Sequence, residues 1–461
     1  SKGNLTRDID PSTVPYTFAD FYQSQESYPT DIAYLTEPFI LRDYRGITVR
    51  IQPFIYFPAT QTLRIYTKLN ISVYPQGTDL SNAILNPKTS YSRYFESAYQ
   101  NMFLNFSAAK YPSLDEEGRI LVIKHSMFDA TIQPWVAWKR QLGFTVDVVD
   151  VTEAGSSAAN IKTYIQNQYN LNNGLMFVQL VGDGPQIPTL TYSSGGSDPS
   201  YALLAGNDNY YDIFVGRFSA QTVAELETQV TRSIFYERDI TAGADWLEKA
   251  VGIASSQGGG SQGDMGESDI THMNNIRTDL LNYGYTTVDQ IYDPGATATQ
   301  VSNAVNPGRG FINYCGHGSD TYWVTTNFNN TNANALTNDN MLPLIVSVAC
   351  VNGNFVSQTC FAEASMRAVN ETTNAPAGTI TFWGSTINQS WSPPMRAQDE
   401  VTDLLVGNLK HRIGSLLFNG AHKMLEVYGS EGLADARTWT IFGDASLMVR
   451  TKNPQVITAD Y

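Results

Sequence analysis

Two short apolar stretches of the sequence each end at a residue that could act as a nucleophile or a base. His317 follows residues 311–315 and Cys350 follows residues 344–349, with a glycine close behind each. Such runs predict buried strands, and the carboxyl ends of neighbouring parallel strands form the crevice where ligands bind. We therefore expect His317 and Cys350 to lie side by side. A thiol beside an imidazole is a nucleophile–base pair, because the imidazole favours the thiolate.

Each of these residues also has an ordinary structural explanation. A cysteine at a strand end is often a small buried hydrophobic side chain, and a histidine there is often only hydrogen-bonded. Cys315, two residues before His317, is open to the same explanation. The occurrence of both, each followed by a glycine-containing turn, favours a catalytic pair.

The composition limits the class of protein and its partners. The chain has 461 residues and a net charge of −15, which argues against nucleic acid or an anionic membrane surface as partner. Its three cysteines, Cys315, Cys350 and Cys360, are an odd number, so at least one thiol is free. No apolar run reaches the length of a membrane span. The chain begins at Ser1 without a signal peptide, so we expect a processed or trimmed piece.

The first 88 residues show strand-like alternation. Apolar and polar side chains alternate between residues 63 and 73, which predicts a half-buried antiparallel strand. Residues 47–51 form a second run, and residues 58–61 supply a turn. We expect residues 1–88 to be a β-rich segment belonging to a sandwich. A linker over residues 89–110 follows it.

From residue 119 onward, short apolar runs alternate with segments of helical periodicity. Thr222 and Glu225 form a capping box that opens one such helix, and residues 127–142 form another. This alternation predicts a parallel sheet covered on both faces, in two α/β subdomains over residues 111–238 and 239–450. Residues 451–461 begin a further linker. The predicted strands are residues 120–123, 145–149, 175–181, 213–215, 251–254, 311–314, 344–349 and 379–382.

Five motifs in the second half of the chain resemble those of one known family. They are Tyr314-Cys-Gly-His-Gly-Ser319, Val348-Ala-Cys-Val-Asn-Gly-Asn-Phe355, Cys360-Phe-Ala-Glu363, Ser385-Thr-Ile-Asn-Gln-Ser-Trp391 and Phe442-Gly-Asp-Ala-Ser-Leu447. Together they resemble the catalytic domain of the gingipains, and the arginine-specific members more than the lysine-specific one. The likeness runs from about residue 111 to about residue 450.

The resemblance implies a fold, an activity and a location. The fold would be a caspase-like three-layer α/β/α catalytic domain of two subdomains, preceded by a β-rich prodomain segment. The activity would be that of a cysteine endopeptidase that cleaves protein substrates after basic residues, with Arg preferred. The protein would be secreted or held at a bacterial cell surface.

Within this reading, Cys350 is the nucleophile and His317 the acid/base. The backbone N–H groups of Cys350 and of Gly316 or Gly318 are the natural donors to the oxyanion. In the arginine-specific family members a Glu orients the histidine, at the position that matches Gln257 here. An uncharged Gln stabilises imidazolium less, so this position predicts lowered activity or a replaced orienting group.

The resemblance places substrate specificity at the start of a predicted helix. Asp269 matches the base of the S1 pocket, where a carboxylate binds an arginine guanidinium in bidentate fashion. Trp391 matches the residue that covers this pocket and can stack on the guanidinium. The alternative for Asp269 is compensation of the helix dipole, and for Trp391 it is loop packing.

Calcium is the cofactor that the resemblance implies. Carboxylate and carbonyl oxygens are the ligands that Ca²⁺ prefers. A first site would use Asp183, Asp208 and Asp212 with the carbonyls of Ala205 and Tyr210. A second would use Glu267, His272, Glu363 and the carbonyl of Phe355. Asp399 and Glu400 match a further ligand pair.

The N-terminal segment resembles part of a gingipain prodomain, which implies that the chain's own prodomain is its inhibitor. The family pattern places the activating cut after Lys110, where arginine-specific members carry Arg, and Arg93 is an alternative. Two rivals stay open. One is a protease that accepts Lys or has broad specificity, and the other is a catalytically weak calcium-binding homologue that acts as an adhesin or binding module.

Overall fold

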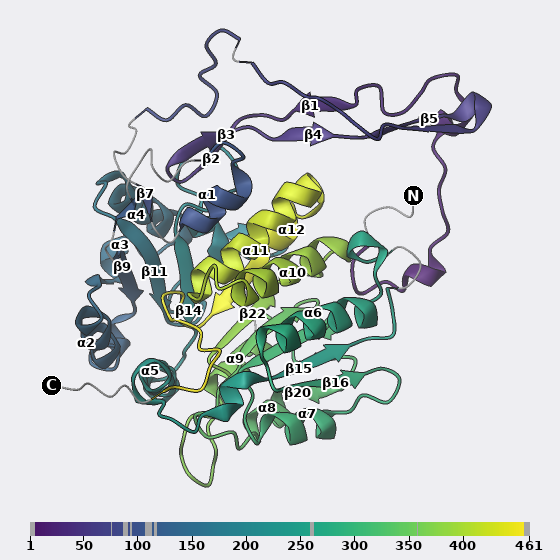
Figure 1. The fold of residues 1–461 in the computed structure, drawn as a ribbon. Coiled ribbons are helices and arrows are strands. Elements are labelled where there is room, and N and C mark those ends of the chain that lie inside the picture. The colour runs from purple at the N-terminus through teal and green to yellow at the C-terminus, as the bar shows by residue number, and fades with distance from the viewer. Residues whose placement is uncertain are drawn as a thin grey trace, which may run out of the picture.

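A ten-stranded sheet runs through the part of the chain after residue 118 (Figure 1). This computed structural model describes residues 5–74, 76–85, 91–92, 95–106, 113–114, 118–258, 262–356 and 358–455. The neighbouring strands are parallel except for the pair β22–β23. In sheet order they are β10 (Thr145–Asp150), β9 (Arg119–Lys124), β11 (Leu175–Val181), β14 (Phe214–Phe218), β23 (Trp439–Phe442), β22 (Thr381–Ser385), β21 (Leu344–Val348), β17 (Phe311–Cys315), β15 (Lys249–Ala254) and β16 (Thr287–Tyr292).

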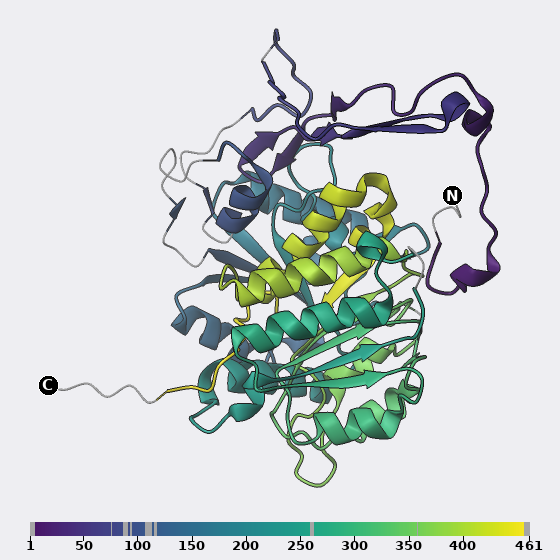
Figure 2. The same ribbon diagram turned by 45° about the vertical axis from the view of Figure 1, so that its right-hand side comes forward.

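Helices cover both faces of this sheet (Figure 2). On one face, α6 (Asp269–Tyr283), α10 (Ser392–Val406) and α11 (Ile413–Tyr428) pack side by side. On the other, α5 (Val223–Ile234) contacts both α2 (Gln133–Gln141) and α9 (Phe361–Arg367). Two faces are used because parallel crossovers are right-handed, so connections that run in opposite directions along the sheet lie on opposite sides. The predicted α/β/α layers are confirmed.

The remaining elements are short or lie outside the sheet. None of the helices in the described residues is long and apolar enough to cross a membrane. The helices are α1 (Glu96–Met102), α3 (Val151–Ala154), α4 (Ala158–Asn170), α7 (Ala298–Val305), α8 (Asn330–Asn334) and α12 (Leu433–Thr438). The strands are β7 (Tyr91–Ser92), β8 (Ser113–Leu114), β12 (Thr191–Tyr192), β13 (Gly195–Gly196), β18 (Gly318–Ser319), β19 (Tyr322–Trp323) and β20 (Phe328–Asn329).

The two predicted subdomains are halves of one continuous sheet. The most C-terminal strand, β23, lies between β14 of the first half and β22 of the second. Strands β16 and β23 were not among those predicted, whereas the run at 175–181 coincides with β11. The central strands β11 and β21 are buried throughout and consist mostly of apolar residues, because both of their faces are covered.

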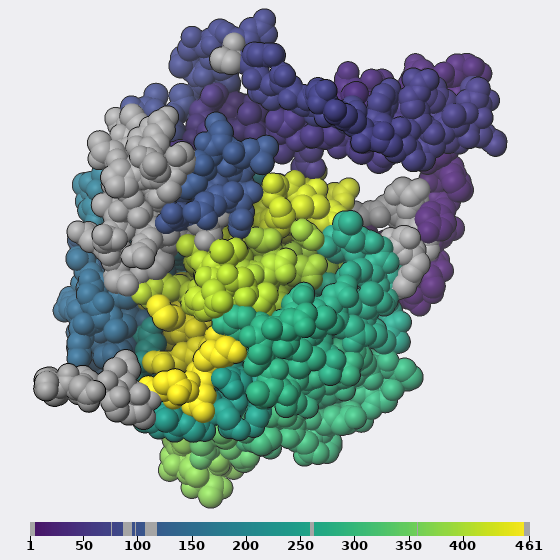
Figure 3. All heavy atoms as spheres, in the orientation of Figure 1, coloured from purple at the N-terminus to yellow at the C-terminus, as the bar shows by residue number. Residues whose placement is uncertain are grey.

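The expected β-sandwich at the N-terminus is wrong for the described residues. The segment forms three separate two-stranded ribbons: β1 (Ala33–Leu35) with β4 (Val49–Ile51), β2 (Phe39–Leu41) with β3 (Tyr44–Gly46), and β5 (Phe54–Phe57) with β6 (Thr62–Ile65). The strand predicted to reach residue 73 stops at Ile65, and all four side chains of β6 are exposed. Alternation predicted strand character correctly, but among the described residues no second sheet covers the apolar face. The ribbons lie across the molecule and project beyond it (Figure 3).

Candidate active site

His317 and Cys350 follow the carboxyl ends of two neighbouring strands of the sheet, as predicted. Strands β17 and β21 are parallel neighbours with Cys315 opposite Val348, and each candidate residue lies two positions beyond its strand. Gly318 fixes the close approach of the two loops, because a Cβ at this position would lie 2.4 Å from the carbonyl oxygen of Cys350 and 3.0 Å from its nitrogen. Only glycine fits there.

Burial holds both groups in their uncharged forms. Cys350 is 1% exposed, and burial raises the pKa of its thiol to about 11, although a backbone hydrogen bond from Gln389 opposes the shift. Burial likewise lowers the pKa of His317. A neutral thiol beside a neutral imidazole is not yet nucleophilic, because the thiolate is the attacking species.

Gln257 connects the histidine to the predicted specificity residue. Its side-chain Oε1 contacts Nε2 of His317, and its backbone carbonyl accepts from the N–H of Asp269 at 3.1 Å. Since an amide oxygen only accepts, Nε2 of the neutral imidazole carries the proton. The contact of Gln257 with Nε2 would let Gln257 orient the imidazole of His317, as expected at this position, but without the negative charge of a Glu.

A residue of the N-terminal segment, Arg7, fills the predicted S1 site. Its Nη1 donates to Oδ2 of Asp269 at 3.2 Å, and its guanidinium lies 4.8 Å from the ring centroid of Trp391. Its Nη2 donates to Sγ of Cys315 and to the carbonyl of Trp391, each at 3.3 Å. Burial alone would lower the pKa of Arg7, but Asp269 and the neighbouring thiols raise it overall.

The chain around Arg7 adopts the backbone geometry of a bound peptide. The N–H of Arg7 donates to the carbonyl of Gln389 at 2.9 Å, and the N–H of Trp391 donates to the carbonyl of Leu5 at 3.1 Å. Thr6 forms an antiparallel bridge with Ser390. An extended segment that pairs with an exposed edge in this way is β-augmentation, a common mode of peptide recognition.

Asp269 is buried and does not provide the N-cap of its helix. It begins α6, as expected, but the N-cap is Ser268, whose side chain accepts from the N–H of Thr271. Asp269 itself is fully buried, and its Oδ2 accepts from Oγ of Ser255 at 2.6 Å. Its carboxylate thus faces the Arg7 guanidinium from a fixed position.

Sequence reasoning missed four residues of this site: Arg7, Ser255, Cys315 as a contact, and Gln389. A basic residue near the start of a suspected prodomain was a usable signal for Arg7. The other three had none, because their roles depend on which backbone passes beside them. The predicted cuts at Lys110 and Arg93 lie outside the described residues.

The structure regroups the expected calcium ligands. Within the described residues, the group whose ligand atoms lie within 4.8 Å of one another is Glu267, His272 and Asp399. Nδ1 of His272 lies 3.3 Å from Glu267 and 3.4 Å from Asp399, while its Nε2 faces Oε1 of Gln398. The oxygen of Gln398 holds the His272 proton on Nε2, so Nδ1 has a free lone pair. This nitrogen and the carboxylates of Glu267 and Asp399 converge on one point, and such a ligand set fits a divalent cation. Glu400 is not part of this group.

Asp183 and Glu363 were expected in different calcium sites, but both carboxylates lie beside the guanidinium of Arg367. Nη2 of Arg367 lies 2.7 Å from Glu363 and 3.4 Å from Asp183. Glu363 therefore does not join Glu267 and His272 as expected, and Asp183 does not join Asp208 and Asp212. The ring of Phe355 packs on Phe442, with ring centroids 5.5 Å apart.

Asp208 and Asp212 accept backbone N–H groups with all four carboxylate oxygens. Oδ1 of Asp208 accepts from Tyr210, and Oδ2 of Asp212 accepts from Ala205 and Leu204. Burial raises the pKa of Asp208 to about 6 and that of Asp212 to about 7. The remaining two oxygens accept from the N-terminal segment, so this arrangement does not fit a calcium ion as it stands.

The chain belongs to peptidase family C25. The model of that family matches residues 113–450, and the C25 propeptide model matches residues 1–103. The chain is 42% identical over 464 residues to Gingipain R2 of Porphyromonas gingivalis, which covers 98% of this chain and 63% of the relative. With Gingipain R1 of the same organism it shares 42% identity over 98% of this chain and 46% of the relative. It thus spans about half the length of these relatives.

A solved structure described as the complex of the P. gingivalis RgpB pro- and mature domains superposes with a TM-score of 0.71. It shares 42% sequence identity and covers 73% of this chain and 81% of its own. Residues 1–103 therefore correspond to the propeptide of this family, and residues 113–450 to its peptidase region.

Proposed function

We propose that the chain is a latent cysteine endopeptidase that cleaves after arginine. The observation that carries the specificity is Arg7, a guanidinium enclosed by Asp269 and Trp391. Lysine has one nitrogen at its tip, so it would satisfy Asp269 and leave the carbonyl of Trp391 without its donor. A polar group left unpaired in a buried site costs about 1–3 kcal/mol, which favours Arg over Lys.

The proposed mechanism uses residues at the edge of β17 and β21. His317 takes the proton of the Cys350 thiol. The resulting thiolate attacks the carbonyl carbon of the substrate and forms a sulfur–carbon bond, while the N–H groups of Cys350 and Gly318 receive the oxyanion. His317 gives a proton to the leaving amine as the peptide bond breaks. Water, deprotonated by His317, then hydrolyses the thioester and restores the thiol. Gln257 keeps the imidazole oriented throughout.

Latency follows from the position of the N-terminal segment. Arg7 fills the specificity site and the segment pairs with residues 389–391, so a substrate cannot bind until this segment leaves. The chain's own propeptide is then its inhibitor. Activation requires cleavage of the propeptide and its release.

Calcium is proposed at Glu267, His272 and Asp399. These residues connect the start of α6 with α10, so the ion would stabilise the helix end that carries Asp269. A bound ion stabilises the folded state by mass action. We also propose, from the family, that the protein works outside the bacterial cell.

The deciding experiment is hydrolysis of paired peptides that differ only in Arg or Lys before the scissile bond. It is done after limited proteolysis, with calcium and a reductant present. Loss of Arg cleavage in both Cys350→Ala and Asp269→Asn supports the proposal. Lys cleavage that survives Asp269→Asn contradicts the assignment of Asp269. No turnover in the processed wild type would favour the weak binding homologue.

A further inference from the structure

The propeptide contacts the rest of the chain in two separate places. Residues 5–7, which we call the arm, occupy the specificity site. Residues 39–46, which form the ribbon β2–β3, and residues 95–102, which form α1 with its N-cap, make the second contact, and we call them together the anchor. Between arm and anchor much of the chain is exposed, with Phe18 71% and Tyr28 58% exposed. The two contacts are therefore joined by a largely exposed stretch of chain.

The apolar side chains of the anchor belong to the hydrophobic core of the catalytic region. Leu41 and Tyr99 are fully buried, and Phe95 is 1% exposed. The ring of Phe95 stacks on that of Phe214 in β14 with the ring centroids 4.8 Å apart. Removing large apolar side chains from water is a dominant contribution to folding and association. The anchor is therefore packed as a part of the layer that covers the central sheet.

Polar groups of the anchor are paired with the catalytic region as well. The N–H of Ile40 donates to Oδ2 of Asp208 at 2.6 Å, and the N–H of Arg42 donates to Oδ1 of Asp212 at 3.0 Å. Nη2 of Arg42 donates to the carbonyl of Leu175 at 2.9 Å. Departure of the anchor would break all three hydrogen bonds at once, because they lie in one buried contact.

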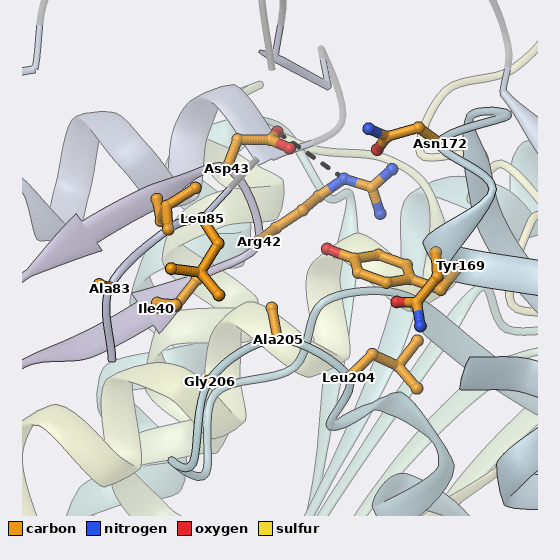
Figure 4. Close-up of a pocket in the computed structure, with 12 residues that line it drawn as sticks. Ile40, Arg42, Asp43, Ala83, Leu85, Tyr169, Asn172, Leu204, Ala205 and Gly206 are labelled. Carbon is orange, nitrogen blue, oxygen red and sulfur yellow. Dashed lines mark ion pairs between the residues drawn. The ribbon is translucent and has the colours of Figure 1, made fainter. Parts of the chain in front are cut away.

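An ion pair connects the two parts of the anchor. Nε of Arg42 lies 3.7 Å from Oδ2 of Asp43, and the same carboxylate oxygen accepts from the hydroxyl of Tyr99 at 2.6 Å. The Arg42 guanidinium lies 5.2 Å from the ring centroid of Phe95 and 5.9 Å from that of Tyr169. Figure 4 shows the pair of Arg42 and Asp43 with Tyr169 beside it. The ribbon and α1 therefore hold together as one unit on the catalytic region.

The arm, in contrast, is bound as a peptide ligand is bound. Its contacts are two backbone hydrogen bonds to residues 389–391 and the buried side chain of Arg7. Any extended peptide that contains arginine offers the same groups, so a substrate can displace the arm by competition. The anchor lies elsewhere: in Figure 1 it covers β11 and β14, whereas α6, whose start binds the arm, lies beyond α10 and α11. A substrate in the specificity site therefore does not compete with the anchor.

We propose that the two contacts separate independently, so that the anchor stays docked on the catalytic region when the arm leaves the specificity site. The release that activation requires is then release of the arm, and the processed enzyme works as a complex with the anchor. The inference rests on the proposed function in taking the arm as the segment that blocks the substrate. It concerns the place of the propeptide and not the chemistry of Cys350.

The first test compares hydrogen exchange in the full chain carrying Cys350→Ala with the same chain carrying Arg7→Ala in addition. The N–H of Trp391, which donates to the arm, is expected to exchange at least about tenfold faster in the double variant, because the buried ion pair is lost. The N–H groups of Ile40 and Arg42 are expected to change by less than about twofold, as independent sites do.

Equal acceleration of all three amides would overturn the proposal, because the propeptide would then leave as one unit. An unchanged Trp391 amide would overturn it too, since Arg7 would not hold a separate contact. Neither this test nor the next needs turnover, so a chain that proves to be an inactive homologue gives the same information.

The second test measures which contact holds the propeptide after the chain is cut. A Cys350→Ala chain carries the recognition sequence of an added protease within residues 107–112. After the cut, gel filtration over a dilution series gives the dissociation constant of the N-terminal fragment. Phe95→Ala is expected to weaken its binding by at least about a hundredfold, because a buried ring is lost. The matched control is Phe54→Ala, which removes a ring that is 46% exposed and should change binding by less than about twofold.

In Arg7→Ala the cut fragment is expected to stay with the catalytic region. Arg42→Gln is a second anchor variant, which keeps the ring of Phe95, and it should weaken binding in the same direction. Dissociation of the fragment in Arg7→Ala as readily as in Phe95→Ala would contradict the proposal. So would unchanged binding in both anchor variants with the fold intact by circular dichroism, because the anchor would then not be the contact that holds the propeptide.

Discussion

Nη1 of Arg7 lies 3.2 Å from Oδ2 of Asp269, and neither side chain is exposed to solvent. The two residues are 262 positions apart, one in the propeptide and one at the start of α6. Removing one partner of a buried ion pair costs about 3–5 kcal/mol, because the other charge is left uncompensated. In the proposed function this pair is both a specificity contact and the contact that keeps the chain latent.

Arg7→Ala should weaken latency without touching the catalytic region. The variant leaves Asp269 free to bind substrate, so the unprocessed chain should hydrolyse Arg peptides at least about tenfold faster than the wild type. The measurement is the initial rate before any cleavage is visible on a gel. Arg45→Ala, which removes an exposed ion pair with Asp79 and hydrogen bonds to Ser81 within the propeptide, should leave the rate unchanged. Equal rates in all three chains would mean that Arg7 does not keep the chain latent.

Asp269→Asn should lower kcat/KM for Arg peptides in the processed enzyme by about two orders of magnitude. The neutral amide keeps the shape of the side chain but loses the charge-assisted hydrogen bonds to the guanidinium. A suitable control is Asp289→Asn. Asp289 lies on the edge strand β16, and its carboxylate is paired with Arg309. A comparable loss in this control would point to general destabilisation.

Gln257→Glu should increase activity and widen its pH range. At present burial lowers the pKa of His317, and the neutral amide of Gln257 does not counter this. A carboxylate at the same place would raise the pKa of His317, so the imidazolium needed beside the thiolate persists to higher pH. The alkaline limb of kcat/KM should therefore move upward. Gln257→Ala, which lacks any orienting group, should instead lose activity.

Asp435→Asn should flatten the pH dependence of stability. Burial raises the pKa of Asp435 from 3.8 to about 7, while its Oδ1 accepts from the N–H of Ser390 beside the peptide-binding edge. Between these two pH values the folded chain binds more protons at this group than the unfolded chain, so stability falls as pH rises. Removing the charge should lessen this fall by on the order of 2–4 kcal/mol. Urea titrations across this pH window, compared between variant and wild type, isolate the contribution of Asp435.

Chelation of calcium should lower the Tm of the full chain, and Asp399→Asn should remove much of that response. The expectation follows from the convergence of Glu267, Asp399 and Nδ1 of His272. Glu227→Gln is a control, because it changes a carboxylate on α5, which covers the opposite face of the sheet from α6 and α10. A chelator that leaves the Tm of the wild type unchanged would contradict calcium at this group.

The local pattern of the sequence determined the central sheet and the neighbouring positions of His317 and Cys350. Apolar runs that end in glycine fix strands and their carboxyl ends, and parallel pairing of β17 with β21 then brings the two residues to one edge. The start of α6 at Asp269 could also be predicted from the sequence, because helix termini depend on local side chains.

Tertiary structure decided everything that depends on distant segments meeting. Alternation over residues 63–73 could not say whether a second sheet would cover it, and none does in the described residues. Asp208 and Asp212 suggested calcium, but their carboxylates accept backbone N–H groups in this fold, and two of these groups belong to Ile40 and Arg42 of the propeptide. The basic character of Arg7 and its place in the propeptide are a signal in the sequence, but its buried ion pair is defined by a partner that lies 262 residues away.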